Sequence, residues 1–120
     1  MQPLTEQELH NLAMNIVGKQ LEADGFEFMA VNSEIGKNPQ FVCLKEKKLH
    51  FVVVKSISYP GDPKDVEFYS SDLNKMKDHA LKFEADTFYA AVGLVNATDY
   101  NLPVYLNQDY IVDYDGLVQI

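Results

Sequence analysis

Apolar residues recur at helical spacing along the first 25 residues of the chain. These positions are Leu9, Leu12, Ala13, Ile16, Val17 and Leu21. Steps of three and four residues place them on one face of an α-helix. Thr5 and Glu8 have the spacing of a capping box, and Gly25 stands where a C-terminal cap glycine is favoured. The pattern predicts an amphipathic helix over residues 5–24.

Three extended segments are expected after this helix. Residues 26–33 are rich in aromatic side chains, residues 40–45 form a short apolar run, and residues 49–57 form a longer one. Turn-forming residues at 36–39 and a polar tip at 46–48 separate the three segments. The stretch 51–54 is apolar at every position, so the third strand is expected to lie centrally in a sheet that is covered on both faces.

The second half of the chain predicts one helix and further strands. Residues 58–68 are dense in proline, glycine and aspartate and predict a loop. A helix is expected over residues 71–84, capped by Ser70 or Ser71. Its apolar face consists of Leu73, Met76, Ala80 and Phe83. Residues 87–95 predict a strand that is apolar on both faces, and the remainder suggests one or two short edge strands.

This order of elements predicts an α/β fold with a mixed sheet. It comprises a helix, three antiparallel strands, a helix, a strand, and short tyrosine-rich edge strands. A helix that connects two buried strands implies a right-handed crossover, and therefore parallel pairing of those strands. With 120 residues, 47% of them hydrophobic, the chain suits a single domain over residues 1–120.

The chain is acidic, and its basic residues are all of one type. There are 18 acidic residues against ten basic ones, for a formal net charge of −8, and all ten basic residues are lysines. Arginine is the side chain best suited to bidentate phosphate and guanine contacts. Nucleic-acid binders usually carry a basic stripe, so this composition disfavours nucleic acid as a partner.

The sequence predicts a cytoplasmic protein without a cofactor. It has no apolar run of the ~20 residues that a membrane-spanning helix needs, and its N-terminus lacks the pattern of a secretory signal. The single cysteine, Cys43, is expected in the core. His10, His50 and His79 lack metal-ligand spacing and are expected to face solvent or to be satisfied polar groups.

The order of elements, together with a buried strand that ends in lysine, resembles the PD-(D/E)xK nuclease fold. Within it, the chain is most similar to small Holliday-junction-resolvase-like proteins of the YraN type. The similarity covers residues 8–95. It includes the helix end at 21–26 (LEADGF), the strand 51–55 (FVVVK) that ends in Lys55, and the lysine-bearing helix with KMKDHALKF. The resemblance implies a restriction-endonuclease-like core.

The same resemblance implies a metal-dependent nuclease, but this chain departs from the pattern at the ligand positions. The family has an aspartate on the second strand, where this chain has Gln40, and an acidic residue two positions before the lysine, where it has Val53. The assisting glutamate of the first helix would fall near Met14. Glutamine is a poor ligand for a hard divalent cation and valine is none. We therefore expect no metal, no catalytic residue and a vestigial site of Gln40, Val53 and Lys55.

Two alternatives stay open at this site. A loop carboxylate could replace the missing ligands, and the candidates are Glu34, Asp62, Asp65 and Glu67. Lys55 could instead be structural, with its methylene stem along the core or in a salt bridge, or it could bind an anion.

The chain is also similar to short bacterial proteins that are named after one component of the sodium-translocating NADH–quinone reductase. That component binds FAD and a ferredoxin-type cluster. One cysteine and no flavin motif cannot hold either group, so we expect that such a name would not describe the activity.

The C-terminal segment gathers tyrosines among acidic residues. It contains Tyr100, Tyr105, Tyr110 and Tyr114 beside Asp99, Asp109, Asp113 and Asp115. Tyrosine is favoured at protein interfaces, so this segment could dock a basic protein or a second copy; the alternative is ordinary edge-strand packing. The leading hypothesis is a non-catalytic nuclease-fold domain that works through protein interaction or as a homodimer. The alternatives are a nuclease with a migrated carboxylate and a weak nucleic-acid-binding module.

Overall fold

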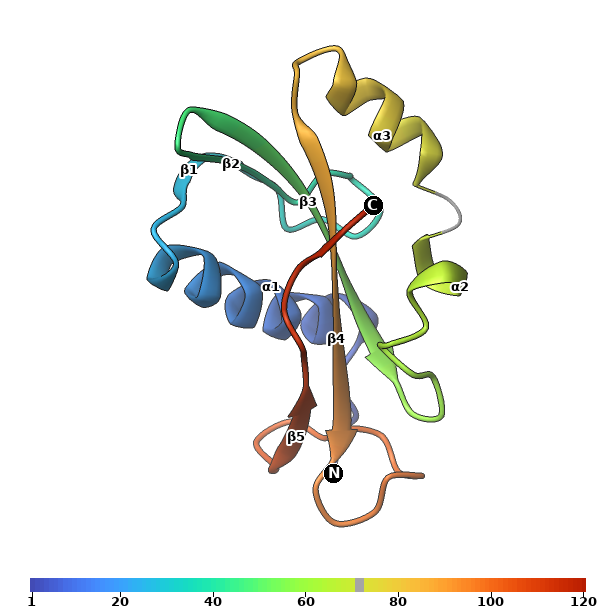
Figure 1. Cartoon of the computed structure of the whole chain (residues 1–120). Helices are drawn as coiled ribbons and strands as arrows, with labels where there is room; N and C mark the ends of the chain where they lie inside the picture. Colours follow the sequence, from blue (N-terminus) through green and yellow to red (C-terminus); the bar gives the residue numbers. More distant parts are fainter. Residues whose placement is uncertain (71–72) are drawn as a thin grey trace.

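A computed structural model describes residues 1–70 and 73–120 of the chain and confirms the α/β architecture with a mixed sheet (Figure 1). The elements, in order, are α1 (Glu6–Ala23), β1 (Glu27–Val31), β2 (Phe41–Lys45), β3 (Lys48–Ser58), α2 (Val66–Ser70), α3 (Asn74–Leu81), β4 (Asp86–Asn96), β5 (Tyr110–Asp113) and β6 (Val118–Gln119). The sheet has six strands in the order β1-β2-β3-β4-β5, with β6 also paired to β4. The predicted parallel pairing is confirmed between β3 and β4, while the other pairs are antiparallel.

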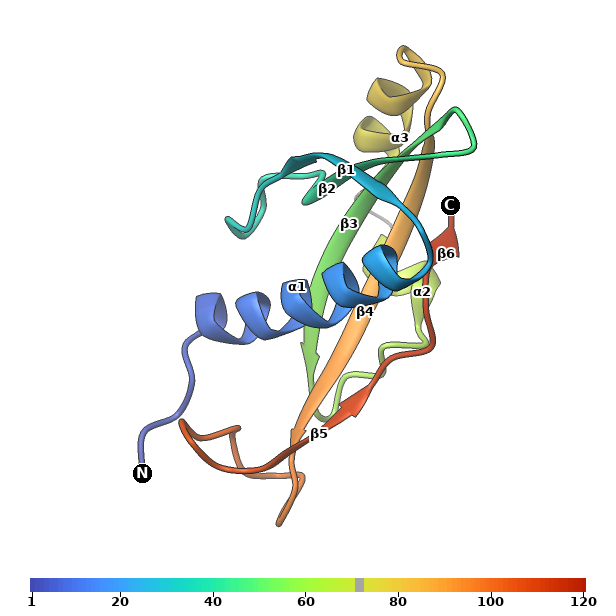
Figure 2. The same ribbon diagram turned by 90° about the vertical axis from the view of Figure 1, so that its left-hand side faces the viewer.

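Helices cover both faces of the sheet. Figure 2 shows α1 crossing one face of the long central strands, while α2 and α3 lie on the other face. Alternate β3 residues point to the two sides. Val52 and Val54 pack in the core under α1, whereas Val53 and Ile57 pack in the core under α3. The prediction that the third strand is central and covered on both sides is therefore confirmed.

The first helix agrees closely with the prediction. The Thr5 side chain accepts a hydrogen bond from the Glu8 backbone N–H at 3.1 Å, and a Glu8 carboxylate oxygen accepts one from the Thr5 N–H at 3.0 Å. Gly25 follows the helix with φ +86°, a conformation that glycine adopts at little cost. Among the described residues, no helix has both the length and the apolar character needed to cross a membrane.

The first edge of the sheet is unusually open. All five residues of β1 are exposed. The pairing of β1 with β2 contains a register shift between Phe28 and Ala30, which leaves Met29 outside the ladder. The side chains on both faces of β1 are therefore exposed and not covered by the helices.

The crossover between β3 and β4 differs from the prediction in three respects. The expected loop over 58–68 already contains the start of α2, because Asp65 accepts a hydrogen bond from the Phe68 N–H at 3.3 Å and caps a short helix there. The helix expected over 71–84 is the shorter α3. Ser70 is the last residue of α2, the N-cap position of α3 is Leu73, and the alternative cap, Ser71, lies outside the described residues.

The expected apolar face of that helix is correct at three of its four positions. Leu73, Met76 and Ala80 are buried, but Phe83 is 53% exposed. Phe83 follows the end of α3, where its ring lies 5.9 Å from that of Phe51. It therefore covers the rim of the core instead of entering it.

The C-terminal segment confirms the short edge strands. β5 and β6 both pair with the outer edge of β4. Of the four tyrosines assigned to this region, Tyr110 lies in β5. Tyr114 lies between the two strands, and Tyr105 forms an isolated bridge with Pro3.

Candidate functional site

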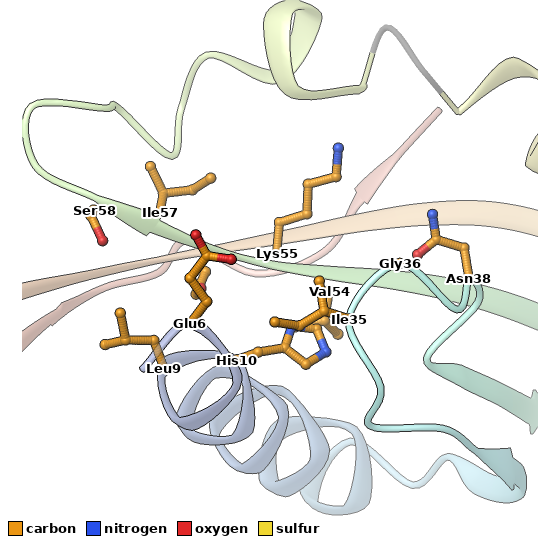
Figure 3. Close-up of a pocket in the computed structure, with 11 residues that line it drawn as sticks. Glu6, Leu9, His10, Ile35, Gly36, Asn38, Val54, Lys55, Ile57 and Ser58 are labelled. Carbon is orange, nitrogen blue, oxygen red and sulfur yellow. The ribbon is translucent and has the colours of Figure 1, made fainter. Parts of the chain in front are cut away.

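Two of the three positions that the sequence analysis expects to form a vestigial nuclease site lie on the same face of β3. Val53 and Lys55 are two residues apart, and this spacing directs both side chains toward the α2 and α3 side. Val53 is fully buried in that core. Lys55 is half-buried, and Figure 3 shows its amine pointing away from α1. The carboxylate expected at position 53 is thus replaced by a side chain that serves the hydrophobic core.

The third position, Gln40, is used for strand pairing. Its side chain is 1% exposed. Its Oε1 accepts a hydrogen bond from the Val54 backbone N–H at 2.7 Å, and its Nε2 donates to Asn38 Oδ1 at 2.8 Å. The Gln40 backbone N–H donates to the Val52 carbonyl at 3.0 Å. Backbone and side chain of Gln40 together continue the β2–β3 ladder by one step.

The loop carboxylates considered as replacement ligands serve local turns or face solvent. Asp62 accepts a hydrogen bond from the Lys64 N–H at 2.9 Å, and Asp65 caps α2. Glu34 and Glu67 are exposed. Across the described residues, no three His, Cys, Asp or Glu side chains gather in a group that could hold a metal ion.

A cavity of about 430 Å³ lies beside Lys55, on the edge of β3 where β2 ends. One wall is the N-terminal half of α1, with Glu6, Leu9 and His10, and another is the loop that contains Ile35 and Asn38 (Figure 3). The floor is the last five residues of β3, from Val54 to Ser58. Apolar surface with a few polar groups is typical of ligand-binding cavities of this size.

His10 is the polar residue of this cavity that the sequence prediction placed wrongly. Its side chain is 4% exposed, and its Nε2 is buried without a hydrogen-bond partner among the described residues. Burial lowers the pKa of the imidazole below its usual value, which favours the neutral ring at pH 7. The signal was present in the spacing, since His10 precedes Ala13, Met14 and Val17 on the buried face of α1.

The four C-terminal tyrosines differ in their exposure and in their contacts. Tyr114 is partly buried beneath α1, where its hydroxyl donates a hydrogen bond to Gln20 Oε1 at 2.5 Å. Tyr100 is 52% exposed, and its ring centroid lies 5.9 Å from that of Tyr59. Tyr105 and Tyr110 share a groove of about 410 Å³ beside α1. An interface that uses all four tyrosines together stays a prediction, and the bond to Gln20 commits Tyr114 to the interior.

Cys43 occupies the predicted core position and is fully buried. Burial raises the pKa of its thiol to about 11. The nucleophilic form of cysteine is the thiolate, so this side chain is a core residue in a protonated state at neutral pH.

Comparisons with known proteins identify a family without assigning an activity. A search of curated proteins found no match, and a search of solved structures found none either. One family model, described as a domain of unknown function (DUF8840), matches residues 7–120. The match begins at the first turn of α1 and spans every strand of the sheet. The chain therefore belongs to the family of the domain of unknown function DUF8840.

Proposed function

We propose that this chain is a non-catalytic domain, on a nuclease-like scaffold, that self-associates through β1. The position of Gln40 supports the non-catalytic part. A metal-binding carboxylate would need free oxygens at this position, whereas the Gln40 oxygen accepts the Val54 N–H and lies in the interior. Val53 offers no ligand atom at all.

One observation carries the self-association: the whole of β1 is exposed at the edge of the sheet. Phe28, Met29 and Val31 are 37%, 56% and 57% exposed, respectively. An edge strand with exposed apolar side chains is a template for pairing with another strand. Two copies of β1 that pair antiparallel around Met29 would join their sheets and cover these side chains.

The charges of the two sheet edges favour β1 over β5 as the contact between identical copies. Asp113 lies in β5, and Asp109 and Asp115 flank it. A symmetric contact brings the same surface of both copies together, so acidic groups would meet across a β5 contact. Along β1 the acidic residue is Glu27, and it stands at one end of the strand.

The non-catalytic part is tested with nuclease assays. Purified protein is incubated with Mg²⁺ or Mn²⁺ and with plasmid DNA, single-stranded DNA and four-way junctions. We expect no cleavage beyond that seen with Lys55→Ala. Metal-dependent cleavage that disappears in Lys55→Ala would instead establish the nuclease with a migrated carboxylate. DNA binding without cleavage that weakens steeply with salt would establish the nucleic-acid-binding alternative.

The self-association is tested by light scattering coupled to size exclusion over a range of concentrations. We expect a dimer for the wild-type chain and a monomer for Met29→Lys, because a lysine at an edge strand opposes strand pairing. Ile111→Lys is the matched control on β5, where the residue is 41% exposed, and should remain dimeric. A wild-type monomer at all concentrations, or a monomer produced only by Ile111→Lys, contradicts pairing through β1.

A further inference from the structure

The edge of β3 that faces β2 is only half covered. The strand β2 pairs with β3 from Lys48 to Val52, and Gln40 then bonds to the Val54 N–H. β3 continues to Ser58, paired along its other edge with β4 as far as Leu94. Within the described parts of the chain, no strand pairs with the β2 side of β3 beyond Val54. This segment, residues 54–58, is called the open edge below.

The open edge presents backbone hydrogen-bonding groups to the cavity. The Val52 carbonyl and the Val54 N–H both point toward β2. Because backbone groups of a strand point to alternate sides, the Val54 carbonyl and both backbone groups of Ser56 point the same way. The Ser58 carbonyl accepts a hydrogen bond from the Gly61 N–H at 2.8 Å, and this turn closes the open edge at its far end.

His10 provides a second, independent observation at this cavity. A buried polar atom without a partner costs about 1–3 kcal/mol, and such atoms are uncommon in native proteins. The Nε2 of His10 is such an atom, on the wall above the open edge. A bound group that offers a hydrogen bond there would satisfy this nitrogen.

The spacing of these groups fits an extended polypeptide better than a compact ligand. Donors and acceptors that repeat every second residue along a strand edge match the backbone of another strand, and added strands are a recurrent mode of peptide recognition. The walls are apolar at Leu9 and Ile35, and the floor is apolar at Val54. They would accommodate an apolar side chain of the added strand on the α1 side.

The charge around the open edge favours a peptide of positive charge. Glu6 is exposed at the α1 wall, whereas Lys55 on the floor points its amine away from α1 (Figure 3). The whole chain carries a formal charge of −8. A net negative protein attracts basic partners at long range. We propose that the open edge binds an extended, basic segment of a partner protein as an added strand, antiparallel to β3 and in line with β2, with an apolar residue beside His10. This goes beyond the proposed dimer, because β1 lies on the far side of β2.

The proposal is tested by selecting a displayed library of random peptides against the immobilised full chain. We expect enriched peptides to be rich in β-branched and basic residues and to contain no proline at their centre. Binding of the best synthetic peptide should slow hydrogen exchange of the Ser56 amide. An absence of enriched peptides, or enrichment of acidic ones, overturns the proposal.

Three variants locate the bound peptide. Ser56→Pro removes an N–H of the open edge and should abolish binding. Because proline can disturb the strand itself, Glu6→Lys at the exposed wall is the second variant, and it should raise the peptide Kd by about tenfold, a loss on the scale of one favourable contact. Its matched control is Glu22→Lys, an exposed glutamate in the last turn of the same helix, which should leave the Kd unchanged. His10→Leu should weaken binding while the fold stays as stable or becomes more stable.

The same measurements separate this site from the dimer contact. Met29→Lys should bind the peptide as the wild type does, whatever its oligomeric state. Loss of peptide binding in Met29→Lys would assign the peptide to β1 and overturn the proposal. Equal binding by Glu6→Lys, His10→Leu and the wild type would overturn it as well, since the peptide would then occupy another surface.

Discussion

The side-chain oxygen of Gln40 takes the place of a backbone carbonyl opposite Val54. The distance from Oε1 to the Val54 N is 2.7 Å, within the range of a good hydrogen bond. The Gln40 Nε2 at the same time donates to Asn38, so the amide uses both its acceptor and its donor. An aspartate, the residue that the nuclease resemblance implies at this position, has no donor when it is ionised, and its side chain is shorter. The requirement at this position is therefore for strand pairing, and it explains the glutamine without reference to a metal.

Gln40→Leu tests this explanation. The leucine keeps a similar volume but leaves the Val54 N–H buried without an acceptor, so the free energy of unfolding should fall by about 1–3 kcal/mol. The measurement is urea denaturation followed by circular dichroism. Gln108→Leu, at an exposed glutamine, is the matched control and should change stability little. Equal stability of Gln40→Leu and the wild type would mean that the hydrogen bond contributes nothing.

The sequence predicted what depends on local pattern. The capping box of Thr5 and Glu8, the helical period that ends at Leu21, and the apolar run of β3 each act within one element, and the structure confirms them. Parallel pairing of β3 and β4 followed from the handedness of crossovers. These features identify the layers of the fold and the position of Lys55 within it.

Features that depend on contacts between distant elements were not predictable in the same way. The role of Gln40 depends on where β2 leaves β3, and the burial of His10 depends on how the loop at Ile35 covers α1. Phe83 matched the helical period but lies beyond the end of α3. In each case tertiary contacts decide the environment of a side chain whose local pattern fits several outcomes.

The hydroxyl of Tyr114 gives a prediction about alkaline pH. Burial, together with the charge of Asp24, raises the pKa of Tyr114 to about 12 from its ordinary value of 10.0. The unfolded state therefore loses this proton at lower pH than the folded state. The contribution of Tyr114 to stability is complete below pH 10 and falls as the pH rises from about 10 toward 12.

Tyr114→Phe should remove this part of the pH dependence. At neutral pH the variant also loses the hydrogen bond to Gln20, so its free energy of unfolding should be lower by about 1 kcal/mol. The difference between wild type and variant, measured by denaturation at a series of pH values, should shrink above pH 10. Tyr100→Phe, at an exposed ring, is the control. A constant difference across the series would contradict the assignment.

The turn between β2 and β3 predicts a stabilising double substitution. Glu46 and Lys47 have φ values of 52° and 67°, and they connect the paired residues Lys45 and Lys48. A two-residue turn with positive φ at both positions favours the sequence Asn-Gly. Glu46→Asn combined with Lys47→Gly should raise the free energy of unfolding by about 1 kcal/mol. The left-handed conformation costs roughly 1–2 kcal/mol per ordinary residue, and the flexibility of glycine in the unfolded state offsets part of that gain. Thermal denaturation measures the gain.

Lys37→Gly is the control for the turn, because Lys37 is an exposed loop residue without a positive φ. Added glycine flexibility should give no gain there and should cost a few tenths of a kcal/mol through the unfolded state. A gain of similar size in both variants would show that the strain of the turn is not the cause.

Gly18 and Gly93 should respond in opposite directions to the same substitution. A Cβ on Gly18, inside α1, would meet the Phe41 ring at 3.4 Å, an ordinary contact. Gly18→Ala should therefore stabilise the fold by about 0.5–1 kcal/mol through helix propensity.

A Cβ on Gly93, in β4, would lie 3.1 Å from both the Asp113 Cβ and the Pro63 Cγ, and 3.3 Å from the Asp113 carbonyl oxygen. Since Asp113 pairs with Gly93 in the ladder, Gly93→Ala must push β5 outward and should destabilise the fold by about 1–3 kcal/mol. Urea denaturation of the two variants beside the wild type measures both signs, and a stabilised Gly93→Ala would show that β5 yields freely at this contact.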